Sequence, residues 1–315
     1  MERVQLGNSG VEVSALCMGS AHFGSTTKDK MVFQLLDQFA EAGGTFIDTA
    51  NSYASWIKGC VGGESETVIG KWMKGRGNRA RMFVATKLGF PYGGSDGGLR
   101  AAEIERECEK SLQRLDVETI DLYYVHKDDR DTPLPEVLEA FSRLVSAGKV
   151  RLVGASNLAV WRLAESRQLA RLNGWPEYCA IEQRYSYLRP RLGTAFTFLP
   201  NVVVSDSLLD YCRTNPVTLV AYTVLLLGAY TRSDRPLPEQ YVGPDSKARL
   251  AVLNAVAAET GATLNQVLIA WLRQSNPPVL PIITASKPAQ LTETLGALGV
   301  KLSADQMGRL NQAGA

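Results

Sequence analysis

The chain contains 315 residues, of which 45% are hydrophobic and 21% are charged, and this balance is typical of a soluble globular protein. Its formal net charge of +2 at pH 7 gives no reason to expect nucleic acid or an anionic membrane as a partner. The longest nearly apolar run, residues 217–230, is shorter than the about 20 residues that a membrane-spanning helix needs, and no apolar export signal opens the chain.

The first predicted element is a β-hairpin, with strands at residues 4–6 and 11–13 joined by a turn at residues 7–10. After it, short continuous apolar runs alternate with longer segments of helical period. Continuous apolar runs are typical of parallel strands that are buried on both faces. The predicted strands cover residues 15–18, 45–48, 82–86, 119–125, 151–155, 179–182, 219–222 and 279–283.

The segments between these strands carry apolar side chains at helical spacing. Residues 32–39 place them at positions i, i+3, i+4 and i+7, and residues 104–115 and 134–145 show the same pattern. Glycine or Asn-Pro turns follow the helical segments. The last predicted helix covers residues 303–312.

Eight strand–helix units in a chain of this length predict an α/β fold, a (β/α)8 TIM barrel, with the N-terminal β-hairpin plugging one end. The alternative is a doubly wound open sheet, which usually carries a GxGxxG motif after an early strand, and the sequence contains none. No linker or change of composition divides the chain, and the glycine-rich residues 89–98 are predicted to form a loop. We therefore expect residues 1–315 to form a single domain.

The cysteine and histidine content limits the kinds of site that the chain can build. There are five cysteines, an odd number, without a CxxC pair, which argues against a disulfide framework and a cysteine-rich zinc site. This usage suits a reducing, cytoplasmic location. His22 and His126 are the two histidines, so a metal site built on several histidines is excluded, and with it a metal-dependent hydrolase barrel. We expect no metal.

Polar side chains directly follow several of the predicted strands, where a barrel of this class places its active site. Taken singly, each has an ordinary structural role: an aspartate caps a helix or forms a turn, a tyrosine packs, and a lysine or histidine is solvated or hydrogen-bonded. Their occurrence on successive strand ends favours a functional site instead. These residues are Asp48, Tyr53, Lys87, His126, Ser156 and Asn157.

The segments that contain these residues resemble the aldo-keto reductase superfamily, from the hairpin to the last helix. The matching segments are GTFIDTANSY, GGESETVIGKW, FVATKLG, DLYYVHKDD, GKVRLVGASNL and SKPAQLTETLGAL. The family's catalytic tetrad maps onto Asp48, Tyr53, Lys87 and His126. The resemblance implies an oxidoreductase that interconverts a carbonyl and an alcohol with NADP(H), or with NAD(H), and with Tyr53 as general acid and base.

The chemistry of the four residues also follows from physical principles. Reducing a carbonyl needs a hydride at carbon and a proton for the developing alkoxide. A tyrosine with an ordinary pKa of about 10 is a weak acid until a cation stabilises its phenolate. Lys87 would supply that cation, and Asp48 would orient Lys87. A neutral His126 would hold the carbonyl oxygen near the Tyr53 hydroxyl.

The resemblance further implies contacts to the nicotinamide half of the cofactor. Ser156 and Asn157 would bind the carboxamide, and Tyr222 would stack on the ring. Glu182 stands where many family members have glutamine, and a carboxylate there can accept a hydrogen bond but cannot donate one. The residues expected around this half are Gly19, Ser20, Asp48, Ser156, Asn157, Glu182, Tyr222, Thr223, Leu225 and Gly228.

The late segment at residues 284–294 resembles the family's cradle for the adenosine phosphate. A helix N-terminus favours a phosphate through its free N–H groups and its dipole. Ser286 and Lys287 would bind a ribose 2′-phosphate, which favours NADP(H), although Ser286 can instead serve as a helix cap. The residues expected here are Ser286, Lys287, Gln290, Glu293 and Thr294.

The substrate is expected to be a small-molecule carbonyl or alcohol near His22, Trp56 and Tyr92, with Trp56 in an insertion at residues 54–62. Aromatic faces mixed with polar groups suit a sugar, a polyol or a glycosylated natural product. The alternative function is a redox-sensing regulatory subunit of the potassium-channel β-subunit type. The chain starts almost directly at the hairpin, without an extension for docking to such a partner, which favours the enzyme. Nothing in the sequence specifies an oligomeric state.

Overall fold

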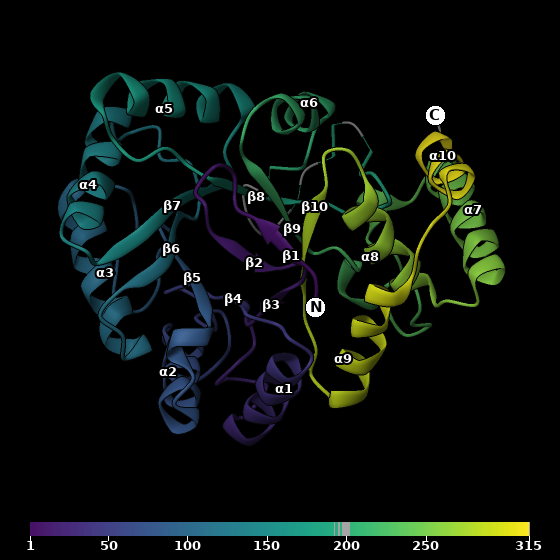
Figure 1. Ribbon diagram of the computed structural model, residues 1–315, viewed down its shortest axis with the longest axis horizontal. Coiled ribbons are helices and arrows are strands. Elements are labelled where there is room, and N and C mark those ends of the chain that lie inside the picture. The colour runs from purple at the N-terminus through teal and green to yellow at the C-terminus, as the bar shows by residue number, and fades with distance from the viewer. Residues whose placement is uncertain (192, 195, 197–201, 315) are drawn as a thin grey trace.

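The computed structural model describes residues 1–191, 193–194, 196 and 202–314. Eight parallel strands form its centre: β3 (Cys17–Gly19), β4 (Phe46–Asp48), β5 (Phe83–Leu88), β6 (Ile120–Val125), β7 (Val150–Ser156), β8 (Ala180–Arg184), β9 (Thr218–Tyr222) and β10 (Val279–Ile283). They close into a barrel in the order β10, β3, β4, β5, β6, β7, β8, β9 (Figure 1). The predicted (β/α)8 TIM barrel is therefore confirmed.

The strands are mostly apolar because the barrel interior covers one face and the helices cover the other. All six residues of β5 and all six of β6 are buried. The strand β5 continues two residues beyond the predicted strand, and Lys87 pairs in register with Tyr124 of β6. Lys87 therefore lies within the barrel wall and not in the loop after it.

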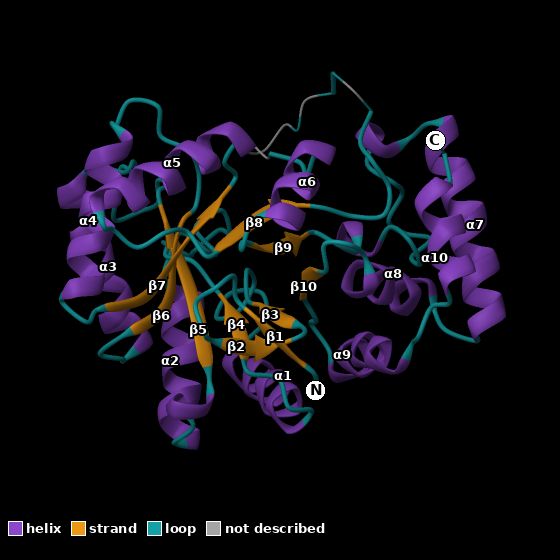
Figure 2. Cartoon of the chain, turned by 45° about the horizontal axis from the view of Figure 1, so that its top comes forward, coloured by secondary structure: helices purple, strands orange, loops and turns teal. Residues whose placement is uncertain are grey.

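The described residues contain ten α-helices around the barrel (Figure 2). They are α1 (Asp29–Glu41), α2 (Glu64–Arg76), α3 (Ala101–Leu115), α4 (Leu134–Ser146), α5 (Val160–Asn173), α6 (Asp206–Thr214), α7 (Pro244–Thr260), α8 (Leu264–Gln274), α9 (Pro288–Leu295) and α10 (Ala304–Gln312). Short 3-10 turns are η1 (Arg79–Arg81), η2 (Leu226–Gly228), η3 (Glu239–Tyr241) and η4 (Gly296–Gly299). Eight helices alternate with the strands, whereas α7 and α10 are additional and pack against each other.

The N-terminal hairpin consists of the antiparallel strands β1 (Arg3–Gln5) and β2 (Glu12–Ser14), which lie across the middle of the ring in Figure 1. Its apolar side chains Leu6, Val11 and Val13 join the core inside the barrel, where they pack with Phe46 and Phe83. Phe46 and Phe83 lie at the amino ends of β4 and β5. The hairpin therefore closes the N-terminal end of the barrel, as predicted, and leaves the opposite end for a site.

The helix α2 contains two glycines in very different surroundings, which allow a matched test of packing. A Cβ atom at Gly70 would lie 2.6 Å from the carbonyl oxygen of Leu115 and 2.7 Å from that of Arg114, whereas a Cβ atom at Gly75 would meet nothing within 4 Å. The close approach at Gly70 lets α2 pack against the end of α3.

We expect Gly70→Ala to lower the free energy of unfolding by about 1–3 kcal/mol, because backbone must move to admit the methyl group. Gly75→Ala should instead raise it by about 0.5–1 kcal/mol, because alanine restricts the unfolded chain and favours the helix. Chemical denaturation of both variants and the wild type measures these changes. Equal effects of the two substitutions would contradict the packing described.

Candidate active site

Lys87 lies at the centre of the candidate site, inside the barrel. Its ammonium donates to Asp48 Oδ1 and Oδ2 at 2.5 and 2.6 Å, to the Thr49 carbonyl at 3.0 Å, and to the Tyr53 hydroxyl at 3.1 Å. The Lys87 side chain is fully buried, and that of Asp48 is 2% exposed. A buried ammonium must be paired and hydrogen-bonded, and the end of β4 provides these partners. The structure thus brings three of the four predicted catalytic residues into direct contact.

Tyr53 lies in the turn after β4, where its hydroxyl also donates to Asp48 Oδ2 at 3.3 Å. Burial raises the pKa of Tyr53 well above its ordinary value, and the adjacent Lys87 ammonium opposes this shift. The phenol therefore keeps its proton at neutral pH, which is the form that a proton donor needs. The lysine's effect has the direction expected from the sequence, although burial outweighs it.

His126 follows β6 and is buried beside Tyr53, with the two ring centroids 5.9 Å apart. Burial, with a smaller contribution from Lys87, lowers the pKa of His126 well below its ordinary value. The imidazole is therefore neutral at neutral pH. Among the described residues its Nδ1 atom has no hydrogen-bond partner. A neutral imidazole at this position can donate one hydrogen bond to a substrate oxygen without bringing a second positive charge next to Lys87.

Glu182 belongs to the same buried cluster as Lys87 and Asp48. The sequence indicated Glu182 as a cofactor contact but did not indicate this position beside Lys87. It lies on β8 with its carboxylate 3.5 Å from the Lys87 ammonium, and its side chain is 3% exposed. Asp48 pairs with the same ammonium, and Glu182 Oε2 is buried without a hydrogen-bond partner among the described residues. Burial, followed by the charge of Asp48, raises the pKa of Glu182 well above its ordinary value. The site thus contains two carboxyl groups for one lysine.

A second polar cluster lies across the mouth of the barrel at the ends of β7 and β9. The Tyr222 hydroxyl donates to Asn157 Oδ1 at 2.7 Å, and Asn157 Nδ2 donates to the His126 carbonyl at 3.0 Å and to Ser156 Oγ at 3.1 Å. Asn157 has a φ of 56°, a left-handed conformation that asparagine tolerates better than most residues. Its backbone N–H donates to the Glu182 carbonyl, so these groups stand close together.

Two other predicted cofactor contacts at the strand ends have structural partners. Ser20 is buried, and its hydroxyl donates to the Asp48 carbonyl at 2.7 Å. A Cβ atom at Gly19 would lie 2.6 Å from a methyl group of Ile282, so only glycine fits between β3 and β10 there. Both residues keep the ends of neighbouring strands together.

The turn after β9 contains the predicted cofactor residues Thr223, Leu225 and Gly228. Thr223 and Leu226 have φ angles of 57° and 46°, and the Leu226 N–H donates to the Thr223 carbonyl. A left-handed conformation is unusual for a β-branched residue such as threonine and marks a strained turn. Leu227 in this turn is 71% exposed.

The predicted phosphate cradle at the start of α9 is closed by a side chain of the same helix. Gln290 Oε1 accepts from the Ser286 N–H at 2.9 Å and from the Ser286 hydroxyl at 3.0 Å. Glu293 accepts from Thr263 Oγ1 at 2.7 Å, and the Thr294 hydroxyl donates to the Gln290 carbonyl at 2.8 Å. Glu293 thereby joins α9 to the start of α8. Lys287 is exposed and takes part in none of the ion pairs of the described chain.

Aromatic side chains surround the Tyr53 hydroxyl at the mouth of the site. The Trp56 ring lies 6.1 Å from the Tyr53 ring and 6.4 Å from the His22 ring, and Trp56 is 58% exposed. Phe90 packs on His126 at 4.7 Å. The sequence analysis missed Phe90, although it follows β5 by two residues and so lies where barrel sites are built.

Tyr92, the third predicted substrate residue, has other partners. Its hydroxyl donates to Glu107 of α3 at 2.7 Å, and Glu107 also accepts from Asn51 at 2.7 Å. Its ring lies 2.5 Å from the position of a Cβ atom at Gly62, at the end of the inserted loop. Tyr92 therefore braces the inserted loop against α3.

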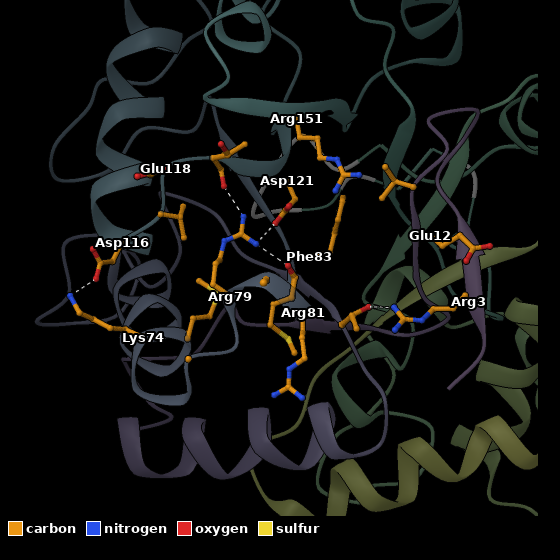
Figure 3. A pocket seen from close by; sticks show the side chains of 18 residues that line it. Arg3, Glu12, Lys74, Arg79, Arg81, Phe83, Asp116, Glu118, Asp121 and Arg151 are labelled. Carbon is orange, nitrogen blue, oxygen red and sulfur yellow. Dashed lines mark hydrogen bonds and ion pairs between the residues drawn. The ribbon is translucent and has the colours of Figure 1, made fainter.

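A hollow of about 840 Å³ lies at the other end of the barrel, beside the hairpin (Figure 3). Arg79 spans it and donates to the carbonyls of Met82 and Thr119 and to the Asp121 carboxylate. These residues lie at or before the amino ends of β5 and β6, where barrel residues serve stability and not chemistry. We therefore place the site at the carboxyl end, despite the size of this hollow.

The described residues lack the features of two other classes of protein. They contain no group of three or more histidine, cysteine, aspartate or glutamate side chains that could hold a metal ion. None of the described helices is long and apolar enough to cross a membrane.

This TIM barrel presents a tyrosine, a lysine, an aspartate and a histidine together at its carboxyl end. That combination is typical of oxidoreductases. The family model described as the Aldo/keto reductase family matches residues 15–315. The chain belongs to this family, whose members act on carbonyls and alcohols with nicotinamide cofactors.

Individual relatives agree with this assignment. The norsolorinic acid reductase stcV of Emericella nidulans is 31% identical, over 95% of this chain and 78% of its own length. The uncharacterized oxidoreductase YrpG of Bacillus subtilis is 32% identical, over 99% of this chain and 95% of its own length. The crystal structure of the thermostable aldo-keto reductase Tm1743 with the inhibitor epalrestat has a TM-score of 0.79 at 28% identity, and the match covers 99% of this chain and 100% of that one.

The two histidines provide a test of the site's electrostatics. Burial lowers the pKa of His22, whereas burial and Lys87 lower the pKa of His126 well below its ordinary value. In an NMR titration we expect His126 to stay neutral at pH values where an ordinary histidine, with a pKa of about 6.5, is already protonated, while His22 takes up its proton below its ordinary pKa. The spectrum of His22→Gln assigns the two signals.

The same shifts predict a pH dependence of stability. The unfolded chain binds protons at these histidines more readily than the folded chain does, so the folded protein should lose stability as the pH falls below about 6.5. If His126 instead took up its proton near the ordinary histidine pKa of about 6.5, the neutral imidazole would be contradicted.

Proposed function

We propose that this protein is an NADP(H)-preferring carbonyl reductase in which Tyr53 transfers the proton. The observation that carries the proposal is the contact of the Tyr53 hydroxyl with the Lys87 ammonium at 3.1 Å, beside a buried, neutral His126. Such a group can donate a proton to an alkoxide while the neighbouring cation stabilises the phenolate that remains. The reverse reaction, oxidation of an alcohol, uses the same groups.

Each of the four residues has a separate task in this reaction. His126 donates a hydrogen bond to the carbonyl oxygen and so orients it towards Tyr53. Tyr53 gives its proton to that oxygen as the negative charge develops. Lys87 stabilises the phenolate, and Asp48 keeps Lys87 protonated and in place through two short hydrogen bonds. The nicotinamide cofactor supplies the hydride when it is bound.

The chain's own residues fit a nicotinamide nucleotide. The hydroxyl of Ser156, the side-chain amide of Asn157 and the buried Glu182 carboxyl provide donors and acceptors for a primary carboxamide. Tyr222 is fixed by Asn157 at 2.7 Å and can support the ring. The exposed, unpaired Lys287 at the start of α9 suits a phosphate, which favours NADP(H) over NAD(H).

The aromatic mouth supports two substrate classes. Trp56, Phe90 and His22 present flat surfaces close to Tyr53, and such surfaces stack equally well on a sugar ring and on an aromatic ring. The name of one relative, an aryl-alcohol dehydrogenase of Pestalotiopsis microspora, favours aromatic substrates. Sugars, polyols and glycosylated natural products remain the other candidates, and both classes belong in the activity panel.

We also propose that residues 1–315 form one domain that works in the cytoplasm. The family match at residues 15–315 and the hairpin packed into the barrel core support a single domain. All five cysteines are free thiols, and four of them are buried, which suits a reducing compartment.

Tyr53→Phe tests the proposed proton donor. We expect turnover of the carbonyl panel to fall by about 10²–10⁴-fold, because proton donation typically contributes this factor. Cofactor binding, measured by fluorescence titration with NADPH, should stay near the wild-type value. Tyr211→Phe on α6, which loses only a hydroxyl that accepts from Arg167, is the matched control. Near-normal turnover of Tyr53→Phe would overturn the proposal.

Lys287→Ala tests the choice of nucleotide. The wild type should bind NADPH more tightly than NADH, and this difference should shrink as salt is added. The substitution should weaken NADPH binding by about tenfold and leave NADH binding almost unchanged, because a charge-assisted contact to phosphate contributes about 1.5–3 kcal/mol at most. Lys301→Ala removes another exposed lysine as a control. Equal wild-type affinity for both nucleotides would contradict the assignment.

A further inference from the structure

The buried cluster at the base of the site has more carboxyl groups than its cation can neutralise. Lys87, Asp48 and Glu182 have side-chain exposures of 0%, 2% and 3%. If all three were ionised, the barrel interior would hold one net negative charge without water around it. Burying an unpaired charge costs several kcal/mol, so proteins normally neutralise such a group by protonation.

The contacts within the cluster decide which carboxyl group holds the proton. Glu182 Oε2 is buried and has no hydrogen-bond partner among the described residues. Asp48 accepts two short hydrogen bonds from Lys87, whereas Glu182 lies 3.5 Å from the same ammonium. The better-paired group keeps the charge, which leaves the proton on Glu182. Burial raises the pKa of both carboxyl groups. The pKa of Glu182 lies further above its ordinary value than that of Asp48 does.

The other elements around the cluster bring no second cation among the described residues. Titratable groups on the neighbouring elements act on Glu182, Asp48 or Lys87. They are Cys17 on β3, Tyr53 in the turn after β4, Tyr124 on β6, His126 after β6, and Tyr222 on β9. Burial raises the pKa of Cys17 and of Tyr124 well above their ordinary values, so both are neutral. His126 is neutral as well. Among the described residues, Lys87 is the cation that lies within ion-pair distance of Asp48 and Glu182, whereas Arg184 of β8 forms no ion pair with either.

We propose that Glu182 is a protonated positioning residue, a neutral acid that does not compete for Lys87 and so leaves its ammonium shared between Asp48 and Tyr53. When Glu182 loses its proton in alkaline solution, its negative charge competes for Lys87 and opposes ionisation of Tyr53. The catalytic part of this inference rests on the proposed function. The protonation itself concerns the free protein and can be tested without substrate or cofactor.

Glutamine is the matched substitution because a neutral carboxylic acid and an amide both offer one donor side and one acceptor side. Infrared difference spectra of the free protein at pH 7, wild type minus Glu182→Gln, should contain the carbonyl band of a protonated carboxylic acid. Wild type minus Glu118→Gln, which removes an exposed glutamate, should lack it. Raising the pH should abolish this band in spectra of the wild type by itself, and this measurement needs no variant. Absence of the band would overturn the proposal.

Thermal unfolding gives a second measurement. A carboxyl group whose pKa is higher in the folded than in the unfolded state contributes stability that is complete below the unfolded pKa of about 4.3 and is lost as the pH rises through the folded pKa. The melting temperature of the wild type should therefore fall relative to that of Glu182→Gln as the pH is raised from acid to alkaline. A constant difference between the two proteins would count against a protonated Glu182.

Activity then tests the positioning role separately. With Glu182→Gln the readout is the pH profile of alcohol oxidation, because the amide that replaces the acid cannot become negatively charged. The rise of alcohol oxidation with pH should begin at a lower pH by about one unit, since no new negative charge opposes the Tyr53 phenolate. Identical pH profiles would overturn the positioning role. If the wild type has the infrared band but no carbonyl is reduced, the proposed function fails and the protonated Glu182 stands.

Discussion

The site depends on a single buried ammonium. Lys87 lies inside the barrel without solvent exposure, where an unpaired charge would be prohibitive, and it finds its partners in Asp48, the Thr49 carbonyl and Tyr53. All three partners come from β4 or the residues just after it, and β4 is the neighbour of β5 in the barrel. The pairing of two adjacent strands therefore both stabilises the charge and places a tyrosine hydroxyl against it.

The same low-dielectric surroundings decide the protonation of the groups near the ammonium. Burial opposes a charge on Tyr53 and on His126, so both are neutral at neutral pH and each has a proton to share. The fold thus keeps one ion pair and surrounds it with neutral proton carriers. Such a site can stabilise a charge that develops during a reaction because water does not screen it.

The two ends of the barrel have different physical tasks. At the amino end, the hairpin and the Arg79 interactions with Asp121 and two carbonyls fill and close the barrel. At the carboxyl end, the strand ends and the loops that follow them carry the groups with chemistry. The inserted loop is held there by Glu64, whose carboxylate accepts from the N–H groups of Val61 and Gly62 at 2.7 and 2.9 Å. This clamp at the start of α2 keeps Trp56 near Tyr53 while leaving its indole exposed.

The sequence by itself determined the eight strands, the hairpin and the residues at the strand ends, because strand burial and turn chemistry are local and leave continuous apolar runs followed by polar residues. It could not show that Glu182 lies against Lys87, that Phe90 packs on His126, or that Tyr92 binds Glu107 of α3. Those contacts cross the barrel or join separate elements. They depend on strand register and loop path, and only the closed tertiary structure fixes these, because it brings together side chains that are 15 to 95 residues apart along the chain.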